Sequence, residues 1–595
     1  MSNLKGGNFI VQDTNPEDVF IWENLSEEQL MIGDMVQDFC VKEIQEPQKK
    51  AGKELSAITD GPEIVKLLEK AAELGLCGVA IGEEHGGLDL DFNTGLVFSE
   101  KIAYGLSFAT TIGAQTSIGS LPIVYYGTKE QKDKYLPGVA SAAIKASYCL
   151  TEPTAGSDAN SGKTKAVLNE VGTHYIMNGQ KMWITNGGFA DLFIVFAKID
   201  SDEDLSAFIV EKAFGGITIG AEEKKLGIKG SSTVQVFFND CPIPKENLLG
   251  ERQGGFKMAL NILNTGRIKL AAGTNGGSKF GITNAVEYAM ERKQFETPII
   301  EFGAMQHKIG EMAARVFAVD AGIYRTGRNI DLKTEELKAE GMGASKAKLE
   351  AVREYAIECA ILKVKGSENA DFVVDEVLQI FGGMGYSQEA GVEMAYRDAR
   401  ITRIYEGTNE INRLLSMAEI TKRAIKTKEI DLIGAGKKVP GRMFSSIISS
   451  GPKTGMPAAD RIVRAIKDVF LLLSGDSGKK LGKKMVDEQE IVMNLADILA
   501  DAFVCESVVL KIKKLQGMQV DAKKLEIQTK MMEVYLYEAI ERTRKAAQDI
   551  LSSYPTNKNL NSYLVRKTLG SYEINPKTLR REITEYLRSQ NGYSF

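Results

Sequence analysis

The chain has 595 residues, of which 43% are hydrophobic and 26% are charged. This is the composition of a multidomain globular protein, and it excludes the disordered, collagen and coiled-coil classes. The formal net charge is only −5, from 74 basic and 79 acidic residues, whereas a nucleic-acid-binding protein is expected to carry a strongly basic surface.

Helical patterns fill the first part of the chain, and we expect an N-terminal helical domain over residues 1–147. Ser26, followed by Glu27 and Glu28, is typical of a helix N-cap with an acidic first turn. The segment 103–126 is apolar and rich in small residues, which predicts buried helices.

The pattern changes between residues 148 and 252, where short stretches rich in β-branched and aromatic residues are separated by Gly, Asn and Asp. Such stretches predict β-strands. No helical pattern lies between them, which favours an antiparallel β domain over a doubly wound nucleotide-binding fold.

Long helical patterns return after residue 253, with apolar residues at i, i+3 and i+4 spacing. We expect a helix bundle over residues 253–428, with helices at 256–291, 305–331, 344–370 and 371–381. Gly, Ser, Pro and Lys accumulate after residue 430, which predicts a linker over 429–459. A further helical domain is expected over 460–595. The predicted fold class is therefore mainly α, with an inserted β domain and an appended C-terminal helical domain.

The use of cysteine and histidine excludes several kinds of site. Six scattered cysteines without a C-x-x-C pair indicate reduced thiols rather than a disulfide framework or a zinc site. With three histidines, neither a His-rich metal site nor a Ser-His-Asp hydrolase is expected, and no metal is assigned. The start of the chain lacks a signal-peptide pattern and no run of about 18 apolar residues occurs, so we expect a cytoplasmic location.

Three segments carry residues suited to ligand chemistry. Residues 148–158, YCLTEPTAGSD, form either a plain turn or a cradle for an anion or a ring edge. In residues 181–188, KMWITNGG, the period of two in a strand places Trp183 and Thr185 on one side; a core tryptophan is the alternative to a cofactor contact. In residues 405–410, YEGTNE, Glu406 precedes Gly407 in a tight turn, as either a general base or a solvated turn residue.

Together these segments resemble the acyl-CoA dehydrogenase family of flavoproteins. RKQF at 292–295 and QIFGGMGY at 379–386 are similar to further motifs of the family, and the segments occur in its order. The resemblance implies an N-terminal helical domain, a middle β domain and a C-terminal four-helix bundle, with FAD between them. The block after residue 430 resembles the extra C-terminal domain of the very-long-chain branch.

The resemblance assigns the catalytic base to Glu406. In the family this base removes the α-proton of an acyl-CoA while a hydride leaves the β-carbon for flavin N5, which yields a trans-2-enoyl-CoA. Desolvation by the bound acyl chain is expected to raise the pKa of Glu406. Some branches carry the base at the position that corresponds to Gly266, which has no carboxylate here.

FAD is the implied cofactor. Thr151 and Thr185 match contacts of the flavin ring, and Trp183 matches an aromatic side chain beside it. The full set of implied FAD positions is Tyr148, Leu150, Thr151, Gly156, Ser157, Trp183, Ile184, Thr185, Arg292, Phe295, Gln306, Gln379, Ile380, Gly382, Gly383, Thr408 and Glu410. Those between 292 and 383 match positions that hold the ADP half of FAD across a subunit interface, which implies a homo-oligomer, either a dimer or a tetramer.

The implied substrate contacts are Ser157, Asn264, Arg267 and Gly407. A long acyl chain is expected, because the segment 112–123 resembles the wall of the acyl pocket in long-chain members, and the C-terminal extension points the same way. Close helix packing is the alternative explanation for Gly113 and Gly119 in this segment.

Electrons are expected to pass from FAD to an electron-transferring flavoprotein. The alternatives are an acyl-CoA oxidase or flavin monooxygenase on the same scaffold, a non-catalytic assembly protein, and a glutaryl-CoA-type decarboxylase, for which the sequence identifies no dedicated cation. Residues 441–448, flanked by Lys437 and Lys438, form either a segment with weak membrane-surface contact or part of a disordered linker.

Overall fold

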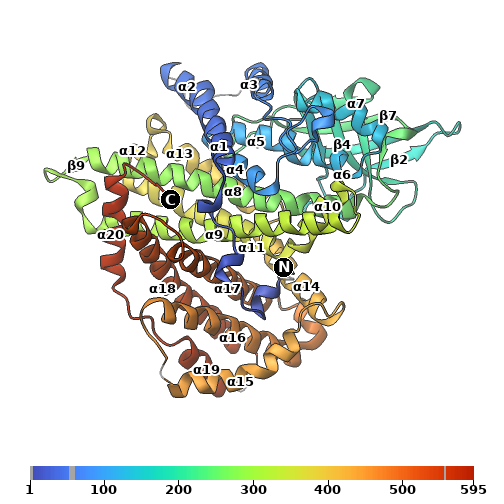
Figure 1. Cartoon of the computed structure of the whole chain (residues 1–595). Helices are drawn as coiled ribbons and strands as arrows, with labels where there is room; N and C mark the ends of the chain where they lie inside the picture. Colours follow the sequence, from blue (N-terminus) through green and yellow to red (C-terminus); the bar gives the residue numbers. More distant parts are fainter. Residues whose placement is uncertain (1–4, 52–60, 450, 555–557) are drawn as a thin grey trace.

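The computed structural model describes residues 5–51, 61–449, 451–554 and 558–595 (Figure 1). The N-terminal helices and the β domain lie on one side of a layer of long bundle helices, and the appended helices cover the other side (Figure 1). The fold class predicted from the sequence is confirmed.

The N-terminal helical domain begins as predicted. Ser26 Oγ accepts from the Gln29 N–H at 3.2 Å, and Ser26 N–H donates to the Gln29 side chain at 3.0 Å, which forms a capping box. The helices are α1 (Glu27–Cys40), α2 (Glu46–Ala51), α3 (Gly61–Glu73), α4 (Phe92–Lys101), α5 (Phe108–Gly113), α6 (Leu121–Tyr126) and α7 (Lys129–Ala140).

The residues before α1 depart from the expectation that 1–147 form one domain. Phe9, Ile10 and Val19 are buried in the hydrophobic core that the bundle shares with the appended helices. Lys514, from an appended helix, donates to the Val19 carbonyl at 2.6 Å. Apolar side chains in a short irregular segment are free to pack on whichever surface offers burial, so sequence order did not decide their place.

The β domain holds β1 (Ala146–Cys149), β2 (Lys165–Leu168), β3 (His174–Thr185), β4 (Leu192–Ile199), β5 (Ser206–Glu211), β6 (Ile217–Ile219), β7 (Thr233–Pro244) and β8 (Leu248–Leu249). The strands follow the order β6-β7-β3-β2-β4-β5-β8. The sheet is not purely antiparallel, because β4 pairs parallel with both β1 and β2. A strand's partner direction depends on tertiary connections, so the local pattern could not predict it.

Strand β4 is buried on both faces, which explains its continuous apolar sequence. Leu192, Ile194 and Phe196 share a core with α6 and α7, whereas Phe193 and Val195 share a second core with β3 and β7. The sheet is thereby fixed against the helices that frame the site.

The bundle helices are α8 (Gly255–Glu291), α9 (Gly303–Ala339), α10 (Ala344–Glu354), α11 (Ala356–Phe381) and α14 (Asn409–Ile425). Between them lie the hairpin β9 (Lys293–Gln294) and β10 (Thr297–Pro298), and the short helices α12 (Gly383–Tyr386) and α13 (Val392–Ala399). The predicted break at residues 370–371 is wrong: the helix is interrupted at Tyr355, and α11 continues to Phe381.

The appended domain comprises α15 (Leu432–Ser449), α16 (Gly455–Leu481), α17 (Gln489–Gln516), α18 (Ala522–Ser553), α19 (Lys558–Leu569) and α20 (Pro576–Ser589). The predicted linker at 429–459 is wrong over α15. Val439 and Met443, one turn apart, are fully buried in the shared core, and Arg442 Nε donates to Asp468 at 3.0 Å. This burial outweighs the helix-weakening effect of the glycines and of Pro440.

No helix in the described ranges is long and apolar enough to cross a membrane.

Candidate active site

The turn between α13 and α14 carries Glu406 in a left-handed conformation. Its φ is +59°, and that of Gly407 is +78°. This backbone conformation costs a residue with a side chain about 1 kcal/mol, so the surrounding structure must hold it.

Side chains from three helices hold the turn by its carbonyl groups. Arg267 Nε, on α8, donates to the Glu406 carbonyl at 3.3 Å, and Lys363 Nζ, on α11, donates to the Gly407 carbonyl at 2.8 Å. Asn412 Nδ2, on α14, donates to the carbonyls of Glu406, Gly407 and Thr408 at 3.3, 2.8 and 3.0 Å. These bonds fix the strained backbone and aim the Glu406 side chain.

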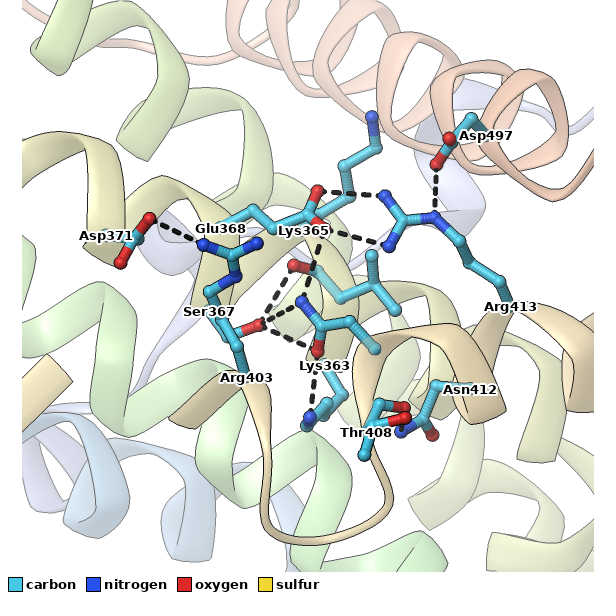
Figure 2. Close-up of polar contacts among 12 residues, drawn as sticks. Lys363, Lys365, Ser367, Glu368, Asp371, Arg403, Thr408, Asn412, Arg413 and Asp497 are labelled. Carbon is cyan, nitrogen blue, oxygen red and sulfur yellow. Dashed lines mark hydrogen bonds and ion pairs between the residues drawn. The ribbon is translucent and has the colours of Figure 1, made fainter. Parts of the chain in front are cut away.

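Helix α11 also grips the chain on both sides of this turn (Figure 2). Before the turn, Arg403 Nη1 donates to Asp371 at 2.8 Å. After it, Arg413 Nη2 donates to Glu368 at 3.0 Å. The turn is therefore clamped to α11 from both ends.

The Glu406 carboxylate lies against the bare backbone of Gly266 on α8. A Cβ added to Gly266 would be 2.6 Å from Glu406 Oε2, so only glycine leaves room for the carboxylate. Within the described residues, Oε2 is buried without a hydrogen-bond partner. Burial raises the pKa of Glu406 to about 7, although Arg267 and Lys363 act in the opposite direction. Such a pKa suits a general base at neutral pH.

Glu406 lines a cavity of about 650 Å³ whose other lining residues are mainly apolar. Thr185 of β3 and Gly113 of α5 also line it. The α8 residues that line it include Gly266, Leu270, Gly273, Gly277, Gly281, Asn284, Tyr288 and Glu291. From Gly266 to Glu291 the helix advances about 37 Å, at about 1.5 Å per residue, so the cavity is elongated along α8.

The two glycines of the segment 112–123 have different surroundings. A Cβ on Gly113 would meet nothing within 4 Å, whereas one on Gly119 would lie 2.9 Å from the Ala146 Cβ. Gly113 keeps the cavity open, and Gly119 allows close packing of the helix on β1.

Among the sequence-predicted cofactor positions, Tyr148 and Ile184 are buried, whereas Gly156 and Ser157 are exposed in the loop after β1. The Tyr148 hydroxyl is buried without a hydrogen-bond partner in the described chain. Burial, followed by the nearby Glu406, raises the Tyr148 pKa. The Tyr148 side chain thus lies near Glu406.

A buried ion pair supports the loop after β1. Lys181 Nζ contacts Glu152 Oε1 at 2.7 Å, with side-chain exposures of 0% and 4%. Glu152 also accepts from the backbone N–H groups of Lys163 and Thr164 at 2.6 and 3.1 Å. Thr151 accepts from the Met182 N–H at 3.0 Å, so the two predicted flavin segments lie side by side.

The expected alternation from Trp183 to Thr185 does not hold as a regular strand. The register of β3 against β7 shifts between Lys181 and Ile184, and Trp183 has a φ of +60°. The bulge leaves the Trp183 side chain 54% exposed. A β-bulge changes the direction of side chains in this way, because side chains alternate with a period of two only in a regular strand.

The remaining cofactor positions lie at the other end of α8. Arg292 and Phe295 belong to the exposed start of the β9–β10 hairpin, and the Phe295 side chain is 89% exposed. Gln306 on α9 is half-buried, and Ile380 on α11 is buried. Gln379, Gly382 and Gly383 are exposed at the end of α11 and in the turn that follows.

Thr408 and Glu410 lie just beyond the catalytic turn. Thr408 caps α14 by accepting from the Ile411 N–H at 3.3 Å, and Glu410 is exposed in the first turn.

Of the predicted substrate contacts, Asn264 and Arg267 are not among the described residues that line the cavity, and Arg267 contacts the turn at Glu406. Both are buried, and Arg267 Nη1 donates to Asn264 Oδ1 at 2.6 Å. The Arg267 guanidinium also donates to the Glu406 carbonyl, so its contacts help to hold Glu406 in place. The sequence resemblance identified the residue, but the packing of α8 against the turn defines its contacts.

Several residues of the candidate site were not predicted from the sequence. Lys363 and Asn412 hold the turn, yet a polar residue within a helical pattern gives no signal by itself. Lys269 lines the cavity, where burial lowers its pKa to about 8. Lys269 places a basic group in this cavity, whereas no cation for a second substrate carboxylate was expected from the sequence.

In the part of the chain that the structure describes, no group of three or more His, Cys, Asp and Glu side chains could hold a metal ion.

Comparison with known proteins gives the family. The chain matches the acyl-CoA dehydrogenase N-terminal domain over residues 26–143, the middle domain over 147–241 and the C-terminal domain over 253–421. A second family description, also named acyl-CoA dehydrogenase C-terminal domain, matches residues 465–566.

Relatives match most of the chain or nearly two thirds of it. A probable acyl-CoA dehydrogenase of Bacillus subtilis is 42% identical over 92% of this chain and 91% of its own length. The very long-chain specific acyl-CoA dehydrogenase of Rattus norvegicus mitochondria is 42% identical over 63% of this chain, which spans only 55% of that protein.

Solved structures agree. The crystal structure of an acyl-CoA dehydrogenase from Bacillus anthracis complexed with FAD matches with a TM-score of 0.94, 38% identity and full coverage of both chains. Butyryl-CoA dehydrogenase from Megasphaera elsdenii matches 67% of this chain and 99% of its own, with a TM-score of 0.58 and 34% identity. The chain belongs to the acyl-CoA dehydrogenase family, which consists of FAD-dependent oxidoreductases.

Proposed function

We propose that this protein oxidises a long-chain fatty acyl-CoA to the trans-2-enoyl-CoA, with Glu406 as the base that removes the α-proton. The observation that carries this proposal is the Glu406 carboxylate, which is held against Gly266 at the cavity with one unpartnered oxygen and a pKa of about 7. A carboxylate in this environment is available to take a proton from a bound substrate.

The groups around Glu406 have different roles in proton removal. Arg267, Lys363 and Asn412 keep the turn in its strained conformation, so that little reorganisation is needed when substrate binds. We propose that the Glu406 backbone N–H donates to the thioester carbonyl, which stabilises the developing enolate. The acyl chain excludes water from the cavity and keeps the pKa of the base raised.

The residues on this chain fit an FAD cofactor. The exposed Trp183 ring, the Thr151 and Thr185 segments and the unpartnered Tyr148 hydroxyl suit a flat heteroaromatic ring with polar edges. When bound, FAD supplies the acceptor for the hydride that leaves the substrate β-carbon. Gly156 has nothing within 4 Å of an added Cβ, which leaves space for a ligand beside the loop.

We propose that each FAD is held by two chains. Arg292 lies 26 residues beyond Gly266, or about 39 Å along α8, so the two groups of cofactor positions, around Thr185 and around Arg292, are far apart within one chain. Phe295 and Tyr386 are 89% and 86% exposed at that end. Aromatic side chains are enriched in protein interfaces, and a second chain at this end would cover both rings. A dimer or a tetramer would bring the cofactor positions around Arg292 of one chain next to those around Thr185 of another.

The length of the cavity supports the long-chain assignment. A bilayer core of about 30 Å accommodates two opposed acyl chains, so one chain needs about 15 Å. The cavity follows α8 for more than twice that length.

Reduced FAD would then pass its electrons to an electron-transferring flavoprotein.

An anaerobic titration of the FAD-loaded protein with acyl-CoAs of increasing length tests this proposal. Bleaching of the oxidised flavin band that strengthens toward long chains is expected. Glu406→Gln should retain FAD and bind acyl-CoA but bleach very slowly, because an amide cannot accept the proton. Glu419→Gln, on α14 but outside the site, is the matched control. Rapid bleaching by Glu406→Gln would remove this residue from the mechanism.

A further inference from the structure

The appended domain contacts α14 (Asn409–Ile425), the helix that follows the catalytic turn. Asp497 on α17 accepts from Arg413 Nε at 2.8 Å. Arg413 lies on α14, which begins at Asn409 directly after the turn. Figure 2 shows Arg413 between Asp497 on one side and Glu368 of α11 on the other.

A continuous series of polar contacts connects Asp497 to the turn. Arg413 binds Glu368 through both terminal nitrogens, at 2.8 Å to Oε1 and 3.0 Å to Oε2. Glu368 Oε1 also accepts from Asn409 Nδ2 at 3.2 Å.

The series ends at the catalytic turn. Asn409 Oδ1 accepts from Lys363 Nζ at 2.8 Å, and the same nitrogen donates to the Gly407 carbonyl at 2.8 Å. A guanidinium is planar and rigid, so the bond to Asp497 through Nε sets the direction in which the two terminal nitrogens face Glu368. The contacts thus extend from the appended domain to the residue after the base.

Partial burial of these three side chains strengthens their effect on the orientation of Arg413. The Arg413 side chain is 15% exposed, and those of Glu368 and Asp497 are 32% and 36% exposed. Arg413 is therefore screened less from its partners than a surface arginine would be.

Domain docking does not depend on Asp497. Asp501, one turn further along α17, is fully buried and accepts from Lys365 of α11 at 2.7 Å and from Arg542 of α18 at 3.0 Å. Apolar side chains of α9, α17 and α18 also share one core. Removal of Asp497 therefore leaves the appended domain in place and changes only the orientation of Arg413.

We infer that the appended domain positions the catalytic base, through Asp497 acting on Arg413. Asp497 is a positioning residue, because it touches neither the cavity nor Glu406. The inference depends on the proposed role of Glu406, and it adds that residues 460–595 tune the chemical step as well as stabilise the bundle.

The experiment uses full-length, FAD-loaded protein and anaerobic single-turnover bleaching with a long-chain acyl-CoA. For Asp497→Ala we expect the bleaching rate at saturating substrate to fall about tenfold, since small displacements of a catalytic group cost factors of this size. The substrate concentration at half-maximal rate should stay unchanged. Asp497→Asn keeps an oxygen that faces Arg413 and should recover most of the rate.

The matched control is Asp460→Ala, which breaks the exposed pair with Lys513 inside the same domain. It should leave both parameters unchanged, and FAD content and thermal stability are measured for every variant. An Asp497→Ala rate equal to that of Asp460→Ala overturns the inference, as does a change confined to substrate affinity. If Asp497→Ala does not fold, Asp497→Leu replaces it, because leucine keeps the side-chain volume but offers no acceptor to Arg413 Nε. An Asp497→Leu rate equal to that of Asp460→Ala then overturns the inference.

Failure of the proposed function gives a different result. If Glu406 is not the base, the wild-type protein does not bleach or Glu406→Gln bleaches normally, whatever Asp497 does. A wild-type protein that bleaches, with an inactive Glu406→Gln and an unaffected Asp497→Ala, rejects the positioning role alone.

Discussion

Replacement of Gly277 by leucine should shorten the acyl chain that the protein accepts. Gly277 lines the cavity on α8, and an added Cβ would meet only the Ala103 Cβ, at 4.0 Å. The backbone therefore tolerates a side chain, and the remainder of the leucine side chain would extend into the space between α8 and the N-terminal helices. Gly277→Leu should fold normally and block the cavity at one level.

The position of the block follows from helix geometry. Gly277 lies eleven residues beyond Gly266, which contacts the base, so the block is about 16 Å from the reacting carbons. An extended chain advances about 1.2 Å per bond, because three backbone bonds span about 3.6 Å. Chains of up to about 14 carbons should still fit.

The loss for longer chains can be estimated from burial. Each methylene that no longer enters the cavity loses about 0.8 kcal/mol. A chain with four excess methylenes loses up to about 3 kcal/mol, or about 200-fold in kcat/KM, since about 1.4 kcal/mol corresponds to a factor of ten.

The assay is kcat/KM across a series of saturated acyl-CoAs. Gly277→Ala is the control, and it should match wild type on every chain because its methyl group fits the available space. Gly281→Leu, one turn further from the base, should move the cut-off to chains about five carbons longer, by the same 1.2 Å per bond. A uniform loss across all chain lengths, or no loss on the longest, would refute a chain that lies along α8.

Three further outcomes are expected. The single-turnover rate should rise with pH through about 7 and level off above it, because the Glu406 pKa is about 7 and only the carboxylate is a base; a rate independent of pH between 5 and 9 contradicts this role. Lys181→Met alone should lower the free energy of unfolding by about 3–5 kcal/mol, because it leaves the buried Glu152 carboxylate without its ion-pair partner. The double variant Lys181→Met/Glu152→Met should show a smaller loss in denaturant unfolding. Lys269 loses its charge as pH rises through about 8, so the wild-type KM for apolar acyl chains should fall above that pH. Lys269→Met should show a low KM at every pH. Parallel KM–pH profiles for wild type and Lys269→Met would contradict an effect of the Lys269 charge on the bound chain.

Local patterns determined the order and type of the main elements. Helical periodicity, strand composition and the Ser26 capping box depend on neighbours within a few residues, so they can be read from sequence. The motifs around Thr151, Trp183 and Glu406 likewise indicated the family and the cofactor.

Packing decided what local patterns could not. The stretch expected to be a linker is helical because Val439 and Met443 find a core built from distant helices. Trp183 is re-aimed by a bulge that depends on the pairing of β3 with β7.

The same holds for the environment of the base. The sequence proposed Glu406, but its raised pKa, its contact with Gly266 and its support by Lys363 arise only when α8, α11 and α14 meet. The pairing of Arg413 with Asp497 joins residues 84 positions apart. Periodicity records which face of a helix is apolar, whereas the partner of a buried charge is set by which helices pack together, and only the tertiary structure contains that information.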